Sequence, residues 1–143
     1  MSRGTRKRED VLATVPLFSA CAKKDLSTIA RVADEVTAPA GKELVREGDT
    51  GHEFFLILDG KATVRRDGED VATLGSGGFF GEMALLDRLP RSASVIADTD
   101  MRLLVIGRRE FGGVIDEVPG LGHKLLQAMA HRLREADARA FSH

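Results

Sequence analysis

The stretch FFGEMALLDRLPRSASV, residues 79–95, brings glycine, glutamate and arginine together in an order that could hold a phosphate group. The glycines up to Gly81 let the backbone approach a ligand closely, and Glu82 would begin a very short helix. Unpaired N–H groups at a helix start, together with the helix dipole, attract an anion. Arg91 follows a proline, and its planar guanidinium can bind two phosphate oxygens. Because the small residues 92–94 would leave room, this stretch predicts a site for a compact phosphate.

Glu82 does not fit a bare phosphate site, because a carboxylate repels a phosphate. Its position makes sense if it faces a neutral donor such as a sugar hydroxyl. A phosphate and a hydroxyl on one small ligand indicate a nucleotide. Each residue also has an ordinary explanation: Glu82 can favour a helix N-terminus, Arg91 can pair on the surface, and the glycines can make turns. Their combination in this order favours the ligand site.

Short strands are predicted on both sides of this stretch. Between residues 36 and 106 turn residues recur at short intervals, and the β-prone runs between them are ELVRE, EFFLIL, KATVRR, DVATL, SASVIA and RLLVI. Strands of this length with frequent turns are typical of a sandwich or barrel. Asp59-Gly60 is the strongest hairpin signal, because Asp-Gly accepts the positive φ values of a tight turn.

Helical periodicity flanks the strands. Residues 11–36 carry apolar residues at helical spacing, and Pro16 divides them into two short helices. After a break at Pro119-Gly120, residues 121–140 predict a long helix with an apolar stripe of Leu126, Met129, Leu133, Ala136 and Ala140. This stripe could pack on its own domain or on a second copy of itself. Residues 1–10 are polar and basic and predict a flexible N-terminus.

The composition excludes several classes of protein. A chain of 143 residues, 43% hydrophobic and 30% charged, can form one soluble domain with a real core. Its 21 basic and 22 acidic residues leave a net charge of −1, which gives no reason to expect nucleic acid as a partner. The apolar run at residues 54–58 is far shorter than the roughly 20 residues of a membrane span. A single cysteine, Cys21, and the lack of an apolar signal sequence favour the cytoplasm.

Residues 79–95 closely resemble the phosphate-binding cassette of cyclic nucleotide-binding domains, of the type found in cAMP receptor proteins and in regulatory subunits of cAMP-dependent protein kinase. VPLFSACAKKDLSTIA and PAGKELVREGDTGHEFFLILDGKATV resemble this family's N-terminal helices and first strands, so the resemblance covers about residues 11–140. It implies a mainly β fold with flanking helices: an antiparallel β-roll or jelly-roll barrel with N-terminal helices, a short phosphate-binding helix and a long C-terminal helix. Residues 11–143 would form this single domain.

The resemblance also assigns roles to residues of the cassette. Gly81 and Glu82 match the family's Gly-Glu pair, whose glutamate binds the ribose 2′-hydroxyl. Met83 and Ala84 match residues whose backbone N–H groups face the cyclic phosphate. Arg91 matches the arginine that pairs with the exocyclic phosphate oxygens.

Further contacts to the nucleotide follow from the same resemblance. The two residues after the family's arginine correspond to Ser92 and Ala93. Apolar contacts to the sugar or base are expected from Val64, Leu74 and Phe80, each of which could also be ordinary barrel core.

The base would be covered by a residue of the C-terminal helix. The resemblance places the polar pair that contacts an adenine amine on Ala136 and Asp137, and alanine cannot make such a hydrogen bond. Asp137 could accept from the single adenine amine or from two donors of guanine, and Arg132, Arg134 and Phe141 are other possible caps. The expected ligand is cAMP, with cGMP as the alternative, and no metal is expected.

The resemblance thus implies a non-enzymatic sensor that closes its C-terminal helix over a bound cyclic nucleotide. It would act through a protein partner or as a homodimer via that helix, without direct contact with nucleic acid or membrane. One alternative is a cupin-type metal-dependent jelly-roll enzyme, since GHEFFLILDG loosely resembles a cupin strand, although only His52 lies in the β region. The other is a structural interaction domain without a ligand, against which Gly81, Glu82 and Arg91 argue.

Overall fold

The computed structural model describes residues 8–15, 18, 21–81, 90–124, 126, 127 and 130. Contacts group the chain into two units. The helical unit comprises residues 1–31 and 113–143, and the β unit comprises residues 32–112. The stretch that predicts the ligand site belongs to the β unit, so the fold of that unit is what positions the site.

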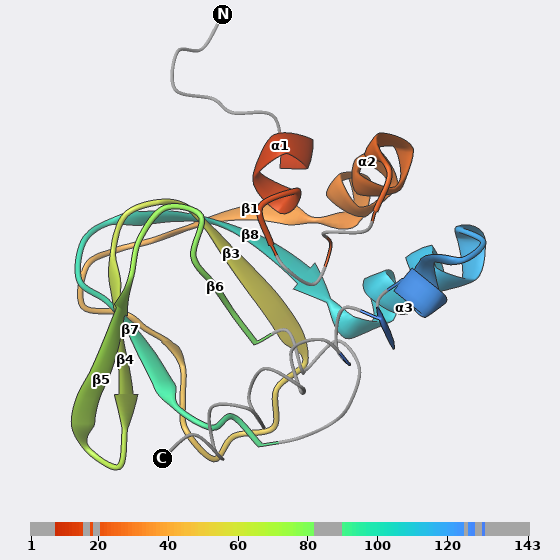
Figure 1. Cartoon of the computed structure of the whole chain (residues 1–143). Helices are drawn as coiled ribbons and strands as arrows, with labels where there is room; N and C mark the ends of the chain where they lie inside the picture. Colours follow the sequence, from red (N-terminus) through yellow and green to blue (C-terminus); the bar gives the residue numbers. More distant parts are fainter. Residues whose placement is uncertain are drawn as a thin grey trace, which may run out of the picture. The chain divides into compact units, whose positions relative to one another are not determined.

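The β unit consists of two four-stranded sheets, shown in Figure 1. The first has the order β1 (Asp34–Ala38), β8 (Met101–Gly107), β3 (Glu53–Asp59) and β6 (Phe79–Phe80). The second has the order β2 (Glu43–Val45), β7 (Ser94–Ala97), β4 (Ala62–Arg66) and β5 (Glu69–Leu74). All pairings are antiparallel, which confirms the predicted mainly antiparallel β fold.

The core of the β unit lies between the two sheets. Because side chains alternate along a strand, β3 sends Phe55 and Ile57 into this core, and β8 sends Leu103 and Val105. The other buried members are Ala38, Ala62, Val95, Ala97 and Met101. The residues of opposite parity on β3 and β8 are buried as well, so these two strands are apolar on both faces.

The turn at Gly60 is not the hairpin that Asp59-Gly60 predicts. β3 and β4 lie in different sheets, so this turn carries the chain from one sheet to the other. Lys61 N–H donates to Thr99 Oγ1 at 3.0 Å, which ties the turn to the β7–β8 connection instead of to a partner strand. The tight hairpin joins β4 to β5 at Asp67-Gly68, where both residues have positive φ, 53° and 80°.

Among the described residues, the helices α1 (Arg8–Leu12), α2 (Lys23–Val32) and α3 (Arg108–Glu117) flank the strands in sequence. The two short N-terminal helices are confirmed, but α1 starts inside the predicted N-terminal tail. The predicted helical region to residue 36 is too long, because β1 begins at Asp34 and pairs with β8. Residues 121–124 are helical, and most of the predicted 121–140 helix lies outside the described residues.

A buried ion pair stands out in the helical unit. Asp25 is only 3% exposed, and its Oδ2 accepts hydrogen bonds of 3.0 Å from Ala22 N–H, at the start of α2, and from Lys124 Nζ. Burial raises the pKa of the Asp25 carboxyl, but these hydrogen bonds and the Lys124 charge outweigh it and hold that pKa below its ordinary value. Asp25 therefore links α2 to the first turn of the C-terminal segment. None of the helices formed by described residues has the length and apolar character needed to cross a bilayer.

Candidate functional site

The backbone of Arg91 is fixed by the loop between β2 and β3. Arg91 N–H donates to the Asp49 carbonyl at 2.7 Å, and the Arg91 carbonyl accepts from Gly48 N–H at 2.9 Å. The preceding residue, Pro90, forms an isolated antiparallel bridge with Thr50. Since both polar backbone groups of Arg91 are used in this way, the direction of its side chain is set before any ligand is considered.

The guanidinium of Arg91 lies against strand β3. Nη2 donates to the Glu53 backbone carbonyl at 3.0 Å, and Cζ lies 5.8 Å from the centroid of the Phe55 ring. Phe55 in turn stacks on Phe80, with centroids 4.7 Å apart and planes inclined by 10°. A cation over an aromatic face is attracted by the ring quadrupole, so the Phe55 ring stabilises the guanidinium in this position.

One donor of Arg91 is left over. Nη1 is buried and donates to no described residue. Burial lowers the pKa of the Arg91 guanidinium, and the charge of Glu53 opposes this shift, but arginine stays cationic at neutral pH because its ordinary pKa is so high. A buried, unpaired donor on a cation costs about 1–3 kcal/mol or more, and an anionic acceptor would remove this cost.

Two glycines make the slot for this side chain. A Cβ atom on Gly51 would lie 2.5 Å from Arg91 Nε, and one on Gly81 would collide with Arg91 Nη1 and lie 2.7 Å from the Glu53 carbonyl oxygen. Gly81 also has a φ of 82°, which favours glycine on conformational grounds. The structure thus brings the predicted residues Gly81 and Arg91 together. Gly51 was not predicted, because packing against a side chain far away in sequence leaves no local pattern.

The other predicted residues fall into two groups. Ser92 is exposed and Ala93 half-buried directly after Arg91, while the half-buried apolar residues packed on the β core include Val64, Leu74 and Phe80. The remaining predicted residues, which lie outside the described residues and stay predictions, are Glu82, Met83, Ala84 and Asp137.

A separate depression of about 500 Å³ is open to solvent and is lined by Thr37, Ala38, Pro39, Asp59, Asp100, Met101 and Arg102. No predicted site residue lines it. Two of its polar side chains are already engaged, since Arg102 pairs with Glu35 at 2.9 Å and Asp100 Oδ1 accepts from Ala40 N–H. Within the described ranges, no three His, Cys, Asp or Glu side chains converge as metal ligands would.

The family model for the cyclic nucleotide-binding domain matches residues 35–118, which includes every strand but the first residue of β1. The chain belongs to the cyclic nucleotide-binding domain family. This confirms the resemblance predicted from residues 79–95.

Proteins that are similar to this chain support the same family assignment. The N-terminal domain of a transcriptional regulator from Streptomyces coelicolor superposes with a TM-score of 0.84 at 32% identity, over 91% of this chain and 94% of that one. The regulatory domain of Toxoplasma gondii PKA, crystallised with cAMP, superposes with a TM-score of 0.69 at 30% identity, over 78% of this chain and 47% of that one. The regulatory subunit of cAMP-dependent protein kinase from Hypocrea atroviridis is 35% identical over 116 residues, which are 81% of this chain and 25% of the relative. The chain thus spans about a quarter of that curated relative.

Proposed function

We propose that this domain is a non-enzymatic sensor that binds cAMP through its cyclic phosphate. The observation that carries the proposal is the buried Nη1 of Arg91, which has no acceptor among the described residues and lies where Gly51 and Gly81 leave room. An exocyclic phosphate oxygen is an acceptor of the right charge for this donor. A cyclic phosphodiester carries one negative charge, which one guanidinium can balance.

The rest of the ligand is assigned to neighbouring residues. Glu82 would accept the ribose 2′-hydroxyl, and the N–H groups of Met83 and Ala84 would complete the phosphate shell. The half-buried Val64, Leu74 and Phe80 offer apolar surface to the sugar and base. We expect such a site to bind the diester without carrying out chemistry on it.

The preference for cAMP over cGMP is supported by what similar proteins bind. The Toxoplasma gondii domain was crystallised with cAMP, and the Hypocrea atroviridis relative is a subunit of a cAMP-dependent kinase. Asp137 would accept a hydrogen bond from the adenine amine. The ligand would favour the form of the domain in which the C-terminal helix is closed over the base, because that form would bind it more tightly than the open form. The ratio of the two affinities sets how far the equilibrium between the open and closed forms shifts. The closed form would act on a partner protein or on a second copy of the domain.

Calorimetric titration with cAMP, cGMP and 5′-AMP tests the proposal. We expect saturable binding of cAMP, weaker binding of cGMP, and little binding of 5′-AMP, whose open phosphate differs in shape and charge. Arg91→Ala should weaken cAMP binding by about a hundredfold or more, because it removes the charged partner of a desolvated anion. Arg91→Lys should keep the charge but lose the paired donors, and bind more weakly than wild type.

Arg102→Ala is the matched control, since Arg102 is a half-exposed arginine that pairs with Glu35 at the separate depression. It should bind cAMP like the wild type. Absence of heat with both cyclic nucleotides at high micromolar concentration, in protein with a cooperative unfolding transition, would overturn the proposal. Chromatography of cAMP after prolonged incubation with the protein should recover it unchanged.

A further inference from the structure

We infer that Arg66, at the end of β4, is a positioning residue for the nucleotide site. Its Nε donates to the backbone carbonyl of Ser92 at 3.2 Å. Ser92 directly follows Arg91, so this bond joins the β4–β5 hairpin to the segment that carries the phosphate-binding arginine. The inference rests on the proposed function and adds to it a residue from outside the sequence stretch that suggested the site.

The alternation of β4 places Arg66 on the side of the β core. Ala62 is buried in that core and Val64 packs against it, so residues of even number on this strand face inward. Thr63 and Arg65 occupy the opposite face. The β4–β7 register runs without a shift from Ala62 to Arg65, so alternation places Arg66 on the same face as Val64, at the solvent-exposed end of the strand.

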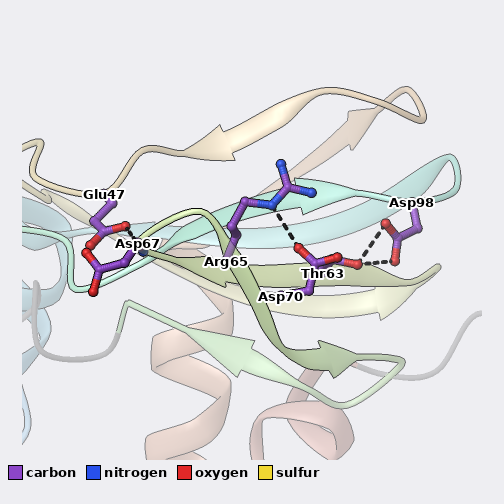
Figure 2. A network of polar contacts seen from close by, with 6 residues as sticks. All are labelled: Glu47, Thr63, Arg65, Asp67, Asp70 and Asp98. Carbon is purple, nitrogen blue, oxygen red and sulfur yellow. Dashed lines mark hydrogen bonds and ion pairs between the residues drawn. The ribbon is translucent and has the colours of Figure 1, made fainter.

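The outward residues of β4 are engaged in a separate surface network, drawn in Figure 2. Arg65 Nε donates to Asp70 Oδ1 at 2.8 Å, and the Thr63 hydroxyl donates to the Asp98 carboxylate. The charge of Arg65 is thus balanced by a carboxylate on the neighbouring strand β5. Among the described residues Arg66 has no such partner, and its one acceptor is a neutral carbonyl. Two adjacent arginines on one strand therefore differ in role.

The hairpin tip is also anchored to the site segment. Asp67 N–H donates to Glu47 Oε1 at 3.0 Å, and the backbone N–H of Glu47 donates to Ser94 Oγ at 2.9 Å. With the bond from Gly48 N–H to the Arg91 carbonyl, three acceptors of residues 91–94 are bound from outside the segment. Arg66 supplies the only one of these three bonds whose donor is charged.

The bond to Ser92 has a consequence for ligand binding. The Ser92 carbonyl belongs to the same peptide unit as the Ala93 N–H, and a cation bound at the carbonyl polarises the N–H at the other end. Ala93 is one of the predicted ligand residues. Arg66 would hold this peptide in place and make its N–H a better donor to an anion, while its unbalanced charge adds attraction for the phosphate.

The test compares Arg66→Met with Arg65→Met, which removes the same charge and keeps the same kind of stem on the adjacent residue. Affinity for cAMP is measured at about 50 mM and about 200 mM salt, where ionic screening differs markedly. We expect Arg66→Met to weaken binding about tenfold and to flatten its salt dependence, as removal of a charged hydrogen-bond donor should. Arg65→Met should bind within about twofold of wild type, because its charge is balanced and solvent-exposed.

Arg66→Lys separates the contribution of the Arg66 charge to cAMP affinity from the contribution of its Nε–H hydrogen bond. It keeps the charge and loses the planar Nε–H, so it should recover the salt dependence and only part of the affinity. Thermal unfolding of each variant without nucleotide controls for a merely structural role, and the Arg66 and Arg65 variants should unfold at similar temperatures.

Equal affinities of the Arg66→Met and Arg65→Met proteins, or an affinity loss that matches a loss of unliganded stability, would overturn the role of Arg66 while wild type still binds cAMP. Failure of wild type itself to bind would instead overturn the proposed function, and the role of Arg66 with it.

Discussion

Arg91 donates to the backbone carbonyl of Glu53 at 3.0 Å, and among the described residues it donates to no carboxylate. A carbonyl fixes the direction of a guanidinium without neutralising it, whereas a carboxylate at the same place would form an ion pair and compete with an anionic ligand. The guanidinium is therefore oriented by neutral groups, whereas an acidic residue would orient it and also neutralise its charge. Orientation comes from the Glu53 backbone and the Phe55 ring, and neither of these neutral groups balances the positive charge, as the proposed phosphate site requires.

Gly51→Ala tests the slot that holds this side chain. A Cβ atom at residue 51 would lie 2.5 Å from Arg91 Nε, so the guanidinium must move away from Glu53 or the loop must shift. A displaced guanidinium should weaken cAMP binding by about tenfold or more, because a charged hydrogen bond depends strongly on geometry. The measurement is calorimetric affinity together with thermal unfolding of the unliganded protein.

Gly75→Ala is the control for that substitution. Gly75 also lacks a positive φ, and a Cβ atom there meets nothing within 4 Å. It should leave the affinity for cAMP unchanged. Wild-type affinity in the Gly51→Ala protein would contradict the view that residue 51 must lack a side chain for Arg91 to reach its position.

Part of this site was predictable from sequence, because its chemistry is local. Gly81 and Arg91 lie in one short stretch, and the structure brings them into contact. Gly51, in the connection between β2 and β3, and Arg66, at the end of β4, contact residues 91 and 92 from far away in the sequence. No sequence spacing reveals a residue that acts through so distant a partner. The family resemblance did not supply them either, because the roles it assigned did not include residues 51 and 66.

The strands were predicted better than their pairing. All six β-prone runs differ only in their ends from strands that were found, but Asp59-Gly60 was given the wrong partner strand. An Asp-Gly pair predicts a residue with a positive φ, and Gly60 has a φ of 107°. It does not report whether the chain folds back on the same sheet or crosses to the other. The crossing is accompanied by the bond from Lys61 N–H to Thr99, a contact between residues far apart in sequence that no local pattern encodes.

Asp25→Asn tests the buried ion pair of the helical unit. At neutral pH we expect a loss of about 1–3 kcal/mol in the free energy of unfolding, because Lys124 loses its charged partner. Partial exposure of the Lys124 side chain to water limits the size of this loss. The pKa of Asp25 is lowered in the folded protein, so its contribution is present above the ordinary carboxyl pKa of about 4 and is lost as the pH falls through the lower, folded value. Wild type and variant should therefore converge in stability under acid conditions.

Asp70→Asn is the comparison for this pair. Asp70 bonds Arg65 at 2.8 Å, but both side chains are largely exposed, at 61% and 47%. Its loss should change the free energy of unfolding by less than about 1 kcal/mol, as for most surface pairs. Urea unfolding at several pH values measures both. A constant difference between wild type and Asp25→Asn from neutral to acid pH would refute the assigned ionisation.

Phe55→Leu tests the aromatic support of Arg91. Phe55 is 8% exposed, stacks on Phe80, and lies under the guanidinium, so leucine removes the ring quadrupole while keeping an apolar side chain in the core. We expect a loss of stability of about 1–2 kcal/mol and a drop in cAMP affinity of about fivefold, the size of one partly desolvated cation–π contact.

Phe54→Leu is the matched substitution on the same strand. Phe54 is fully buried, but the alternation of β3 turns its ring to the face opposite the Arg91 side chain. It should cost similar stability and leave the affinity of the remaining folded protein unchanged. Two variants with equal losses of stability and unequal losses of affinity would show that the ring under Arg91 acts on the ligand site. Equal losses of both would mean that Phe55 serves the site only by packing.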